Sequence, residues 1–267
     1  MKIYKNKYRL INEINKFKSL SFIPTMGALH EGHISLIKKA RKKFNKIIVS
    51  IYVNPKQFEN KIDFKNYPVN FQNDIKLLKK NKVDYLFIPN FKQIFSFKPR
   101  HNIYVDKFEK KLCGKHRAGH FKGVIEVVNR LLEIINPRFL YLGVKDFQQM
   151  ILIKNHIKKT KIKTKIISCK TVRDKNGLAL SSRNQLLNTK ERKIAGNIVN
   201  FLKRNKKRIN SKNINKFKMV ILNKGISKID YVKILNVKSL NYANRVNKNC
   251  RVFIAYYIRE IRLIDNF

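Results

Sequence analysis

Two histidines, His30 and His33, follow a short apolar run of the sequence with two residues between them. The segment 24–33 reads PTMGALHEGH and joins that strand-like run to an amphipathic stretch. A helix that begins here would present unpaired backbone N–H groups and a positive dipole end, which together bind phosphate. Two imidazoles beside it can donate hydrogen bonds to phosphate oxygens while charge shifts to a leaving pyrophosphate. The segment therefore predicts a phosphate site, in which Gly27 permits a tight turn and Gly32 a close approach of the ligand.

Polar side chains also follow two later strand-like runs. Asn54 and Gln57 come just past a continuous β-branched run, and Lys145 and Asp146 come just past a shorter strand-like run at 139–142. Because ligands of parallel sheets bind at the carboxyl ends of the strands, we expect these residues to face a ligand. Amides donate and accept hydrogen bonds without adding charge, and a lysine offers a point charge to phosphate.

Strand-like and helical stretches alternate over the first two thirds of the chain. The expected helices are residues 8–18, 71–80, 123–135 and 147–157, with another that starts near His33, and the expected strands are residues 20–24, 47–53, 83–88, 139–142 and 165–172. The helix near His33 has Ile34, Ile37 and Phe44 as candidates for its buried stripe. Such alternation predicts an α/β fold, a Rossmann-like parallel sheet with flanking helices and right-handed crossovers.

The character of the sequence changes after Arg183. Helices are expected at 189–206 and 212–223, and strands at 231–237, 252–258 and 262–264. We therefore predict two domains, a Rossmann-like domain over residues 1–175 and a smaller, lid-like α+β domain over residues 176–267.

The composition excludes several classes of protein. The chain has 267 residues, of which 43% are hydrophobic, so a disordered protein is excluded. Its 61 basic and 16 acidic residues give a formal net charge of +45. Such a charge attracts nucleic acid, anionic membranes and phosphate compounds alike, but lysine is spread from Lys2 to Lys248, which argues against a dedicated nucleic-acid arm.

Cysteine usage and apolar runs indicate the compartment. Three widely spaced cysteines exclude a disulfide scaffold and a cysteine-based zinc site. The sequence has no run of about 18 apolar residues and no apolar signal core near its start, so we expect a cytoplasmic protein without a membrane partner.

The His-x-Gly-His segment resembles the signature of the nucleotidyltransferase superfamily. The longer stretch 22–37, FIPTMGALHEGHISLI, resembles the pantothenate synthetase (pantoate–β-alanine ligase) family specifically. Further matching blocks follow in the same order: SIYVNPKQF at 50–58, RAGHFKGV at 117–124, GVKDFQQ at 143–149 and TVRDKNGLALSSRN at 171–184. Residues 262–265 resemble the last strand of that family.

The resemblance implies an ATP-dependent ligase. Such an enzyme joins pantoate to β-alanine through a pantoyl-adenylate and forms pantothenate, AMP and pyrophosphate. Its partners would be these small molecules and a second copy of the chain in a homodimer, with no dedicated nucleic-acid partner. ATP would be a substrate, with Mg²⁺ held through its phosphates. Asp74 lies where the family contacts metal, but Asn73 stands where an acid is common, so no protein metal ligand is assigned.

The resemblance also assigns site residues. The catalytic set would be His30, His33, Lys145, Ser181, Ser182 and Arg183. The ATP-binding set would be Met26, Gly27, Ala28, Leu29, His30, Glu31, Gly32, His33, Gly143, Val144, Lys145, Asp146, Val172, Leu180, Ser181, Ser182 and Arg183. The pantoate and β-alanine set would be Asn54, Gln57 and Gln149.

Four positions depart from the family pattern. Cys113 stands for a usual Glu, Ala118 for a usual Pro, Val144 for a usual Glu and Val69 for a usual Arg. These changes affect the expected details of the 112–119 loop and the edge of the nucleotide pocket.

Two alternative functions remain open at this point. Another adenylyltransferase of the superfamily would transfer AMP to a phosphate and would not require the glutamines Gln57 and Gln149. A basic nucleic-acid-binding protein with a vestigial nucleotide site would retain RNA at physiological salt and would not use ATP.

Overall fold

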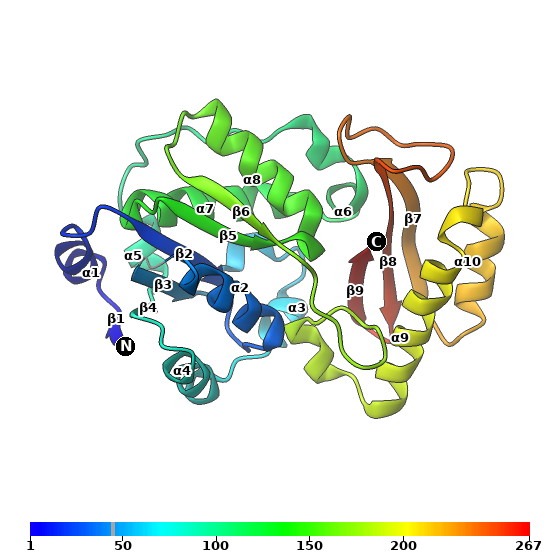
Figure 1. The fold of residues 1–267 in the computed structure, drawn as a ribbon, viewed down its shortest axis with the longest axis horizontal. Coiled ribbons are helices and arrows are strands. Elements are labelled where there is room, and N and C mark those ends of the chain that lie inside the picture. The colour runs from blue at the N-terminus through cyan, green and yellow to red at the C-terminus, as the bar shows by residue number, and fades with distance from the viewer. Residues whose placement is uncertain (44–45) are drawn as a thin grey trace. The chain divides into compact units, whose positions relative to one another are not determined.

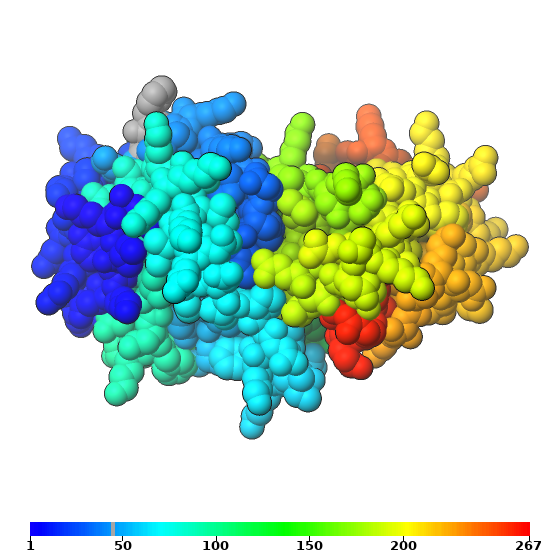
Figure 2. Space-filling model, turned by 90° about the horizontal axis from the view of Figure 1, so that it is seen from below, coloured from blue at the N-terminus to red at the C-terminus, as the bar shows by residue number. Residues whose placement is uncertain are grey.

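The computed structural model describes residues 1–43 and 46–267, which form two compact units (Figure 1). Unit 1 comprises the described residues of Met1–Glu109 and Arg117–Lys170, and unit 2 comprises Lys110–His116 and Thr171–Phe267. In Figure 2, blue and cyan atoms belong to unit 1 and yellow to red atoms to unit 2. Lys110–His116 therefore packs with unit 2, a feature that the predicted division at residues 175–176 did not include.

Unit 1 contains a six-stranded parallel sheet in the order β1-β4-β3-β2-β5-β6. Its strands are β1 (Lys2–Tyr4), β2 (Leu20–Thr25), β3 (Lys46–Ile51), β4 (Tyr85–Phe87), β5 (Phe139–Gly143) and β6 (Lys165–Cys169). The prediction of a Rossmann-like parallel sheet is confirmed. The continuous apolar runs arise because β2, β3 and β4 are covered on both faces, with Phe22 and Ile23 both fully buried.

Helices lie on both faces of this sheet (Figure 1). They are α1 (Lys7–Ile14), α2 (Glu31–Arg41), α3 (Lys61–Lys65), α4 (Phe71–Lys80), α5 (Phe91–Phe95), α7 (His120–Ile135) and α8 (Phe147–Lys159). One core joins α2 and α4 to the sheet through side chains such as Ile34, Leu78 and Val49. Right-handed crossovers place α8 on the other face, because β5 and β6 extend the sheet in the opposite direction from β3 and β4.

The order of the strands defines where a ligand is expected. From β2, the chain builds outward to β3 and β4 on one side, and β5 and β6 lie on the other. The strand order reverses between β2 and β5, which makes the boundary between these two strands a topological switch point. Ligands of open α/β sheets bind at such a point, at the carboxyl ends of the strands. Thr25 pairs with Ile51, so the loops after β2 and β3 leave the sheet at the same level.

Unit 2 is a three-stranded antiparallel sheet with two helices packed on it (Figure 1). Its elements are α6 (Leu112–Lys115), α9 (Thr189–Arg204), α10 (Ile214–Leu222), β7 (Lys228–Asn236), β8 (Cys250–Ile258) and β9 (Ile261–Asn266). Ile198, Leu202 and Ile221 of the helices share one core with Val232 and Ile254 of the sheet. The prediction of a small α+β region at the C-terminal end is confirmed.

The structure differs from the predicted elements mainly at their ends. Strand β1 and the short helices α3, α5 and α6 gave no usable pattern in the sequence because each has five residues or fewer. Helix α7 begins three residues earlier than predicted, after Gly119 in a left-handed conformation (φ 72°). Ile34 and Ile37 are buried as predicted, whereas Phe44 lies outside the described residues. Within the described part of the chain, every helix is too short or too polar to cross a lipid bilayer.

Candidate active site

The two histidines of the predicted phosphate site cap helix α2. His30 is the N-terminal capping residue, with an extended backbone (φ −142°, ψ 174°). Its Nδ1 accepts a hydrogen bond from the backbone N–H of Gly32 at 3.1 Å, and Nδ1 of His33 accepts from the backbone N–H of His30 at 3.3 Å. The imidazoles thus form a reciprocal capping box, which pairs backbone donors that the start of a helix leaves open.

This arrangement fixes the proton on each ring. A ring nitrogen that accepts a hydrogen bond carries no proton, so each neutral imidazole of His30 and His33 carries its proton on Nε2. The ring centroids lie 4.1 Å apart with an interplanar angle of 40°. The pair therefore offers two Nε2–H donors beside the N-terminus of a helix, which is the chemistry that phosphate oxygens accept.

Burial keeps both rings neutral. Desolvation lowers the pKa of His30 to about 4, with a further lowering by the Lys145 ammonium and an opposing effect of Asp146. The pKa of His33 is lowered well below its usual value, first by burial and then by His30 and Lys145. At neutral pH the pair acts as hydrogen-bond donors, and the positive charge beside it is that of Lys145.

Asp74 of helix α4 holds the loop between β2 and α2. Its side chain is fully buried, and its two oxygens accept hydrogen bonds from the backbone N–H groups of Ala28 at 2.9 Å and Leu29 at 2.7 Å. Ala28 has φ 49°, a conformation that L-residues rarely adopt, and Gly27 has φ 82°. Burial raises the pKa of Asp74, and the two backbone donors partly oppose that rise. The carboxylate therefore fixes the loop that precedes the histidine pair.

Lys145 and Asp146 lie in a 3₁₀ turn, Val144–Asp146, that follows β5. The Lys145 side chain is 17% exposed and that of Asp146 is 45% exposed, with Nζ and Oδ1 3.5 Å apart. The loops that carry Lys145 and the histidines follow the paired strands β5 and β2, and the Lys145 ammonium is near enough to lower the pKa of both histidines. The structure therefore brings His30, His33 and Lys145 together, as the sequence predicted.

Gln57 and Asn54 follow β3 in and before the 3₁₀ turn η1 (Pro55–Gln57). The Gln57 Nε2 atom donates to Met26 Sδ at 2.8 Å, which joins the loops after β2 and β3. Asn54 is 1% exposed, and its Nδ2 donates to the backbone oxygen of Gly123 at 3.1 Å and lies 3.4 Å from Gln57 Oε1. The structure thus gives Asn54 a role in positioning Gln57, and its contact with a substrate stays a prediction.

Gln149 lies in the first turn of α8 and is partly buried. The preceding Gln148 is buried, and its Nε2 donates to the backbone oxygen of Phe108 at 2.8 Å. The sequence therefore singled out the more exposed of two adjacent glutamines, and its role in binding pantoate stays a prediction.

The remaining predicted nucleotide residues belong to unit 2. Val172 and Leu180 face each other in a hairpin, where the Leu180 N–H donates to the Val172 oxygen at 3.0 Å. Ser181 caps the short turn Ser182–Leu186, and its Oγ accepts from the backbone N–H of Arg183 at 3.4 Å. Their role in binding ATP stays a prediction.

Two of the four departures from the family pattern have a clear setting. Cys113, in unit 2, is buried with its Sγ 2.9 Å from Tyr231 Oη and 3.8 Å from both terminal nitrogens of Arg262. Val69 is 51% exposed at the surface of unit 1. Ala118 is exposed and Val144 is partly buried in the turn before Lys145.

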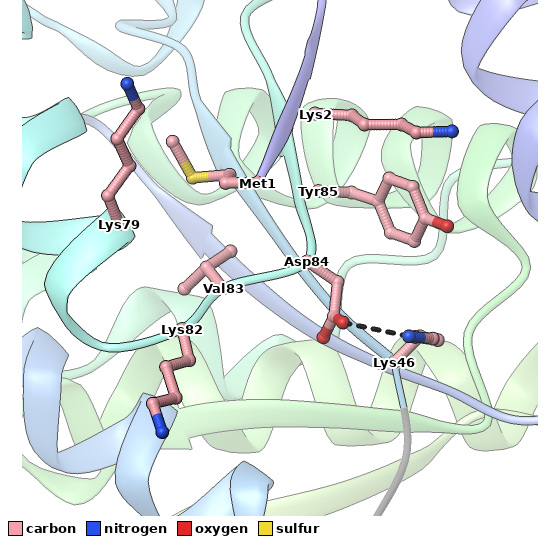
Figure 3. Close-up of a pocket in the computed structure, with 8 residues that line it drawn as sticks. All are labelled: Met1, Lys2, Lys46, Lys79, Lys82, Val83, Asp84 and Tyr85. Carbon is pink, nitrogen blue, oxygen red and sulfur yellow. Dashed lines mark hydrogen bonds and ion pairs between the residues drawn. The ribbon is translucent and has the colours of Figure 1, made fainter.

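A basic pocket of about 460 Å³ lies at the amino ends of β1, β3 and β4, whereas the candidate site lies at the carboxyl ends of the strands (Figure 3). Its lining includes four lysines and one carboxylate, Asp84, which contacts Lys46 at 3.2 Å and Arg41 at 3.1 Å. Figure 3 shows the ammonium groups of Lys2, Lys79 and Lys82 pointing apart. The pocket therefore has no convergent set of donors and is separate from the candidate site.

Across residues 1–43 and 46–267, the His, Cys, Asp and Glu side chains form no group of three or more that could hold a metal ion. Asp74, which aligns with a metal-contact region, has both oxygens committed to backbone donors. Asp74 is therefore committed to the loop, and no role as a metal ligand is assigned to it.

Comparisons with known proteins agree with this geometry. The sequence model of the Pantoate-beta-alanine ligase family matches residues 2–267. Pantothenate synthetase from Clostridium botulinum (strain ATCC 19397 / Type A) is 42% identical over 255 residues, covering 93% of this chain and 91% of that protein. Pantothenate synthetase from Fervidobacterium nodosum is 40% identical over 260 residues, covering 95% and 92%.

Solved structures agree as well. A pantoate-beta-alanine ligase from Francisella tularensis, in complex with beta-gamma ATP and beta-alanine, superposes with a TM-score of 0.86 at 40% identity and covers 100% of this chain and 97% of its own. Pantothenate synthetase from Thermus thermophilus superposes with a TM-score of 0.92 at 28% identity, with coverage of 100% and 99%. The fold and the histidine loop thus define a nucleotidyltransferase-like α/β protein. Within that class, the chain belongs to the pantoate–β-alanine ligase family.

Sequence reasoning missed the role of Asp74. It considered this residue only as a metal ligand, whereas the structure shows it holding the loop before His30. A signal was present, because Asp74 and the buried Leu78 are four residues apart and so lie on the same face of α4. An acid on the buried face of a helix requires partners, and loop N–H groups are suitable ones.

Replacement of Asp74 by Asn tests the loop. The amide keeps the shape of the side chain but places its N–H group opposite a backbone N–H group that the carboxylate paired. Two buried donors are then unpaired, which lowers the free energy of unfolding by about 1–3 kcal/mol. We expect the KM for ATP to rise about tenfold or more, because the loop that carries His30 is displaced. The matched control is Asp106→Asn, which alters a carboxylate that accepts from the backbone N–H of Phe108 at 2.8 Å. Equal KM values for ATP in the two variants would contradict the assignment.

The neutral histidine pair predicts a pH dependence. The pKa of His30 falls from 6.5 in the unfolded chain to about 4 in the folded one, so the unfolded state binds more protons between these values. The free energy of unfolding should therefore decrease as the pH falls from about 6.5 to about 4. The double variant His30→Asn, His33→Gln keeps a capping box without titration and should make this slope smaller. The slope that remains belongs to other groups with lowered pKa values, such as His116, His156 and Glu13. Urea unfolding followed by circular dichroism at several pH values measures how the free energy of unfolding depends on pH. The same dependence in the wild type and the double variant would exclude the histidine pair as its source.

Proposed function

We propose that this protein condenses pantoate with β-alanine at the expense of ATP, forming pantothenate, AMP and pyrophosphate. The observation that carries the proposal is the capping box of His30 and His33, which directs two neutral Nε2–H donors beside the start of α2. Membership of the family supports the choice of substrates. The two alternatives raised by the sequence, another adenylyltransferase and a nucleic-acid-binding protein, gain no support from these findings.

In the first step, a carboxylate oxygen of pantoate attacks the α-phosphorus of ATP, and the bond to the bridging oxygen of pyrophosphate breaks. The negative charge moves to the leaving group, so the protein contributes mainly positioning and electrostatic stabilisation. His30 and His33 donate hydrogen bonds to phosphate oxygens from Nε2, and Lys145 supplies the positive charge beside them. Gln57 orients pantoate through its carboxamide, and Gln149 is assigned to the same task.

In the second step, the neutral amine of β-alanine attacks the carbonyl carbon of the pantoyl-adenylate. The bond to the AMP phosphate oxygen breaks, the amine loses a proton, and pantothenate and AMP leave. No side chain is assigned as the base for that proton. Val172, Leu180, Ser181, Ser182 and Arg183 are assigned to ATP from the resemblance alone, and this assignment stays a prediction.

Three further statements belong to the proposal. Mg²⁺ enters with ATP and is bound by its phosphates, which neutralises charge there. The protein acts in the cytoplasm, and it functions as a homodimer. Large apolar side chains at the surface of unit 1, Ile62 and Val69 among them, are of the kind that an oligomer buries.

An omission assay tests the function. Purified protein is mixed with ATP, Mg²⁺, pantoate and β-alanine, and AMP is measured with each component left out in turn. We expect AMP to form in a steady state only when all four are present, because the adenylate stays bound until the amine attacks it. AMP release that does not depend on pantoate would contradict the proposal.

The variant His33→Ala tests whether the histidine pair takes part in the reaction. We expect turnover to fall roughly 10²–10³-fold, the scale seen when one electrostatic donor is lost. The control is His101→Ala, which alters a histidine of unit 1 that contacts Glu133 at 3.2 Å. Unchanged turnover in a folded His33→Ala protein would remove this residue from the mechanism.

Sedimentation equilibrium tests the homodimer. We expect a mass near twice 31.7 kDa at micromolar concentration. A single species at the monomer mass, retained at higher protein concentration, would exclude the dimer.

A further inference from the structure

The block RAGHFKGV at 117–124 has no assigned role in the proposed reaction, and in the structure it forms the start of helix α7. This start packs against the turn η1, which carries Gln57. The contacts between the two segments involve main-chain atoms as well as side chains, so they determine where the backbone of Gln57 lies.

The most direct contact comes from His120, which is buried at the first position of α7. Its Nδ1 lies 2.6 Å from the backbone oxygen of Gln57. A carbonyl oxygen can only accept a hydrogen bond, so Nδ1 carries the proton and donates it. The imidazole of His120 therefore holds the main chain of Gln57, whose side chain contacts Met26 in the loop after β2.

Arg117 selects this form of the ring. Its Nη1 lies 2.9 Å from His120 Nε2, and Arg117 remains protonated and can only donate. Nε2 of His120 must therefore accept, which places the single proton of a neutral imidazole on Nδ1. Arg117 Nη2 also lies 3.4 Å from the Gln57 oxygen. The guanidinium thus orients the imidazole, and the imidazole orients Gln57.

The backbone of α7 at Gly123 lies very close to the backbone of η1. A Cβ added at Gly123 would lie 2.2 Å from the backbone oxygen of Lys56 and 3.0 Å from the backbone nitrogen of Gln57, so only glycine fits there. The backbone oxygen of Gly123 in turn accepts from Asn54 Nδ2 at 3.1 Å. At the surface, Lys56 Nζ pairs with Glu126 Oε1 at 2.9 Å. These contacts attach η1 to the first two turns of α7.

We infer that His120 is a positioning residue for substrate binding: oriented by Arg117, it holds the backbone of Gln57 so that the Gln57 carboxamide is presented to pantoate. This inference rests on the proposed function, in which Gln57 binds pantoate. It assigns the RAGHFKGV block to the pantoate side of the reaction and not to ATP, because its contacts are to the loop after β3.

Two amide variants of His120 form a matched pair. In His120→Asn, the carboxamide nitrogen can occupy the position of Nδ1 and keep the donor to Gln57. In His120→Gln, the longer side chain carries its carboxamide to the position of Nε2, where its oxygen accepts from Arg117, and the donor to Gln57 is lost. We expect the KM for pantoate to rise about tenfold in His120→Gln and less than about threefold in His120→Asn, with the KM for ATP within about twofold of wild type in both.

A second variant tests the same contact from the Arg117 side, so the test does not depend on the folding of one protein. A control variant measures nonspecific effects of substitution. Arg117→Met removes the group that orients the ring and should raise the KM for pantoate in the same direction. His101→Leu alters a histidine near the other end of α7 and should leave all KM values within about twofold. Circular dichroism verifies the fold of each protein.

A double-mutant cycle separates positioning from a general structural role. If His120 acts through Gln57, then His120→Gln should change the KM for pantoate less than about twofold in a Gln57→Ala background. Equal pantoate KM values for His120→Gln and His120→Asn, or a full effect of His120→Gln without the Gln57 side chain, would overturn the inference while the proposed function stands. If wild-type protein forms no pantoate-dependent AMP, or if Gln57→Ala leaves the pantoate KM unchanged, the underlying assignment fails and the inference fails with it.

Discussion

The histidine pair of the candidate site depends on two imidazoles remaining uncharged. His30 and His33 each accept a backbone hydrogen bond on Nδ1, and protonation of either ring would turn that acceptor into a donor facing another donor. Burial and the nearby Lys145 ammonium prevent this by lowering both pKa values. The site therefore divides its work between a directional pair of neutral donors and a separate positive charge.

The parallel sheet makes this division possible. Strand β2 lies between β3 and β5, so the loops that carry the histidines, Gln57 and Lys145 all leave the sheet at one edge. Two of these loops are fixed by residues distant in sequence: Asp74 fixes the loop after β2, and His120 fixes the loop after β3. These loops are irregular in conformation, and the buried Asp74 and His120 side chains limit their freedom.

Much of the fold follows from local patterns in the sequence. Helix α4 occupies the predicted residues 71–80, because asparagines at both ends supply its caps and its apolar residues recur at helical spacing. Strands β2 to β6 were predicted because each belongs to a short run rich in apolar residues, which in β3 are mostly β-branched. Strand β1 was missed, since three residues at a sheet edge have no periodicity to detect. The family resemblance confirmed by the comparisons came from several short motifs in a fixed order.

The site was predictable in its residue types but not in its hydrogen bonds. The spacing of His30 and His33 indicates a phosphate site, yet it does not reveal that both Nδ1 atoms are already used and that only Nε2 can face a ligand. Contacts such as Asp74 with Leu29 or His120 with Gln57 join residues 45 and 63 positions apart. Such pairs depend on tertiary packing, which no local pattern contains.

The assignment of Lys110–His116 to unit 2 affects how the chain can be divided. The polypeptide passes from one unit to the other three times, at residues 109–110, 116–117 and 170–171. A fragment cut at Thr171 would therefore lack Cys113, which lies against Tyr231 and Arg262, and Lys111, which donates to the backbone oxygen of Leu240. The side chains of Tyr231 and Arg262 would each lose a neighbour in such a fragment. The smaller unit is thus completed by a piece of chain from the middle of the larger one, and neither can be excised as a continuous segment.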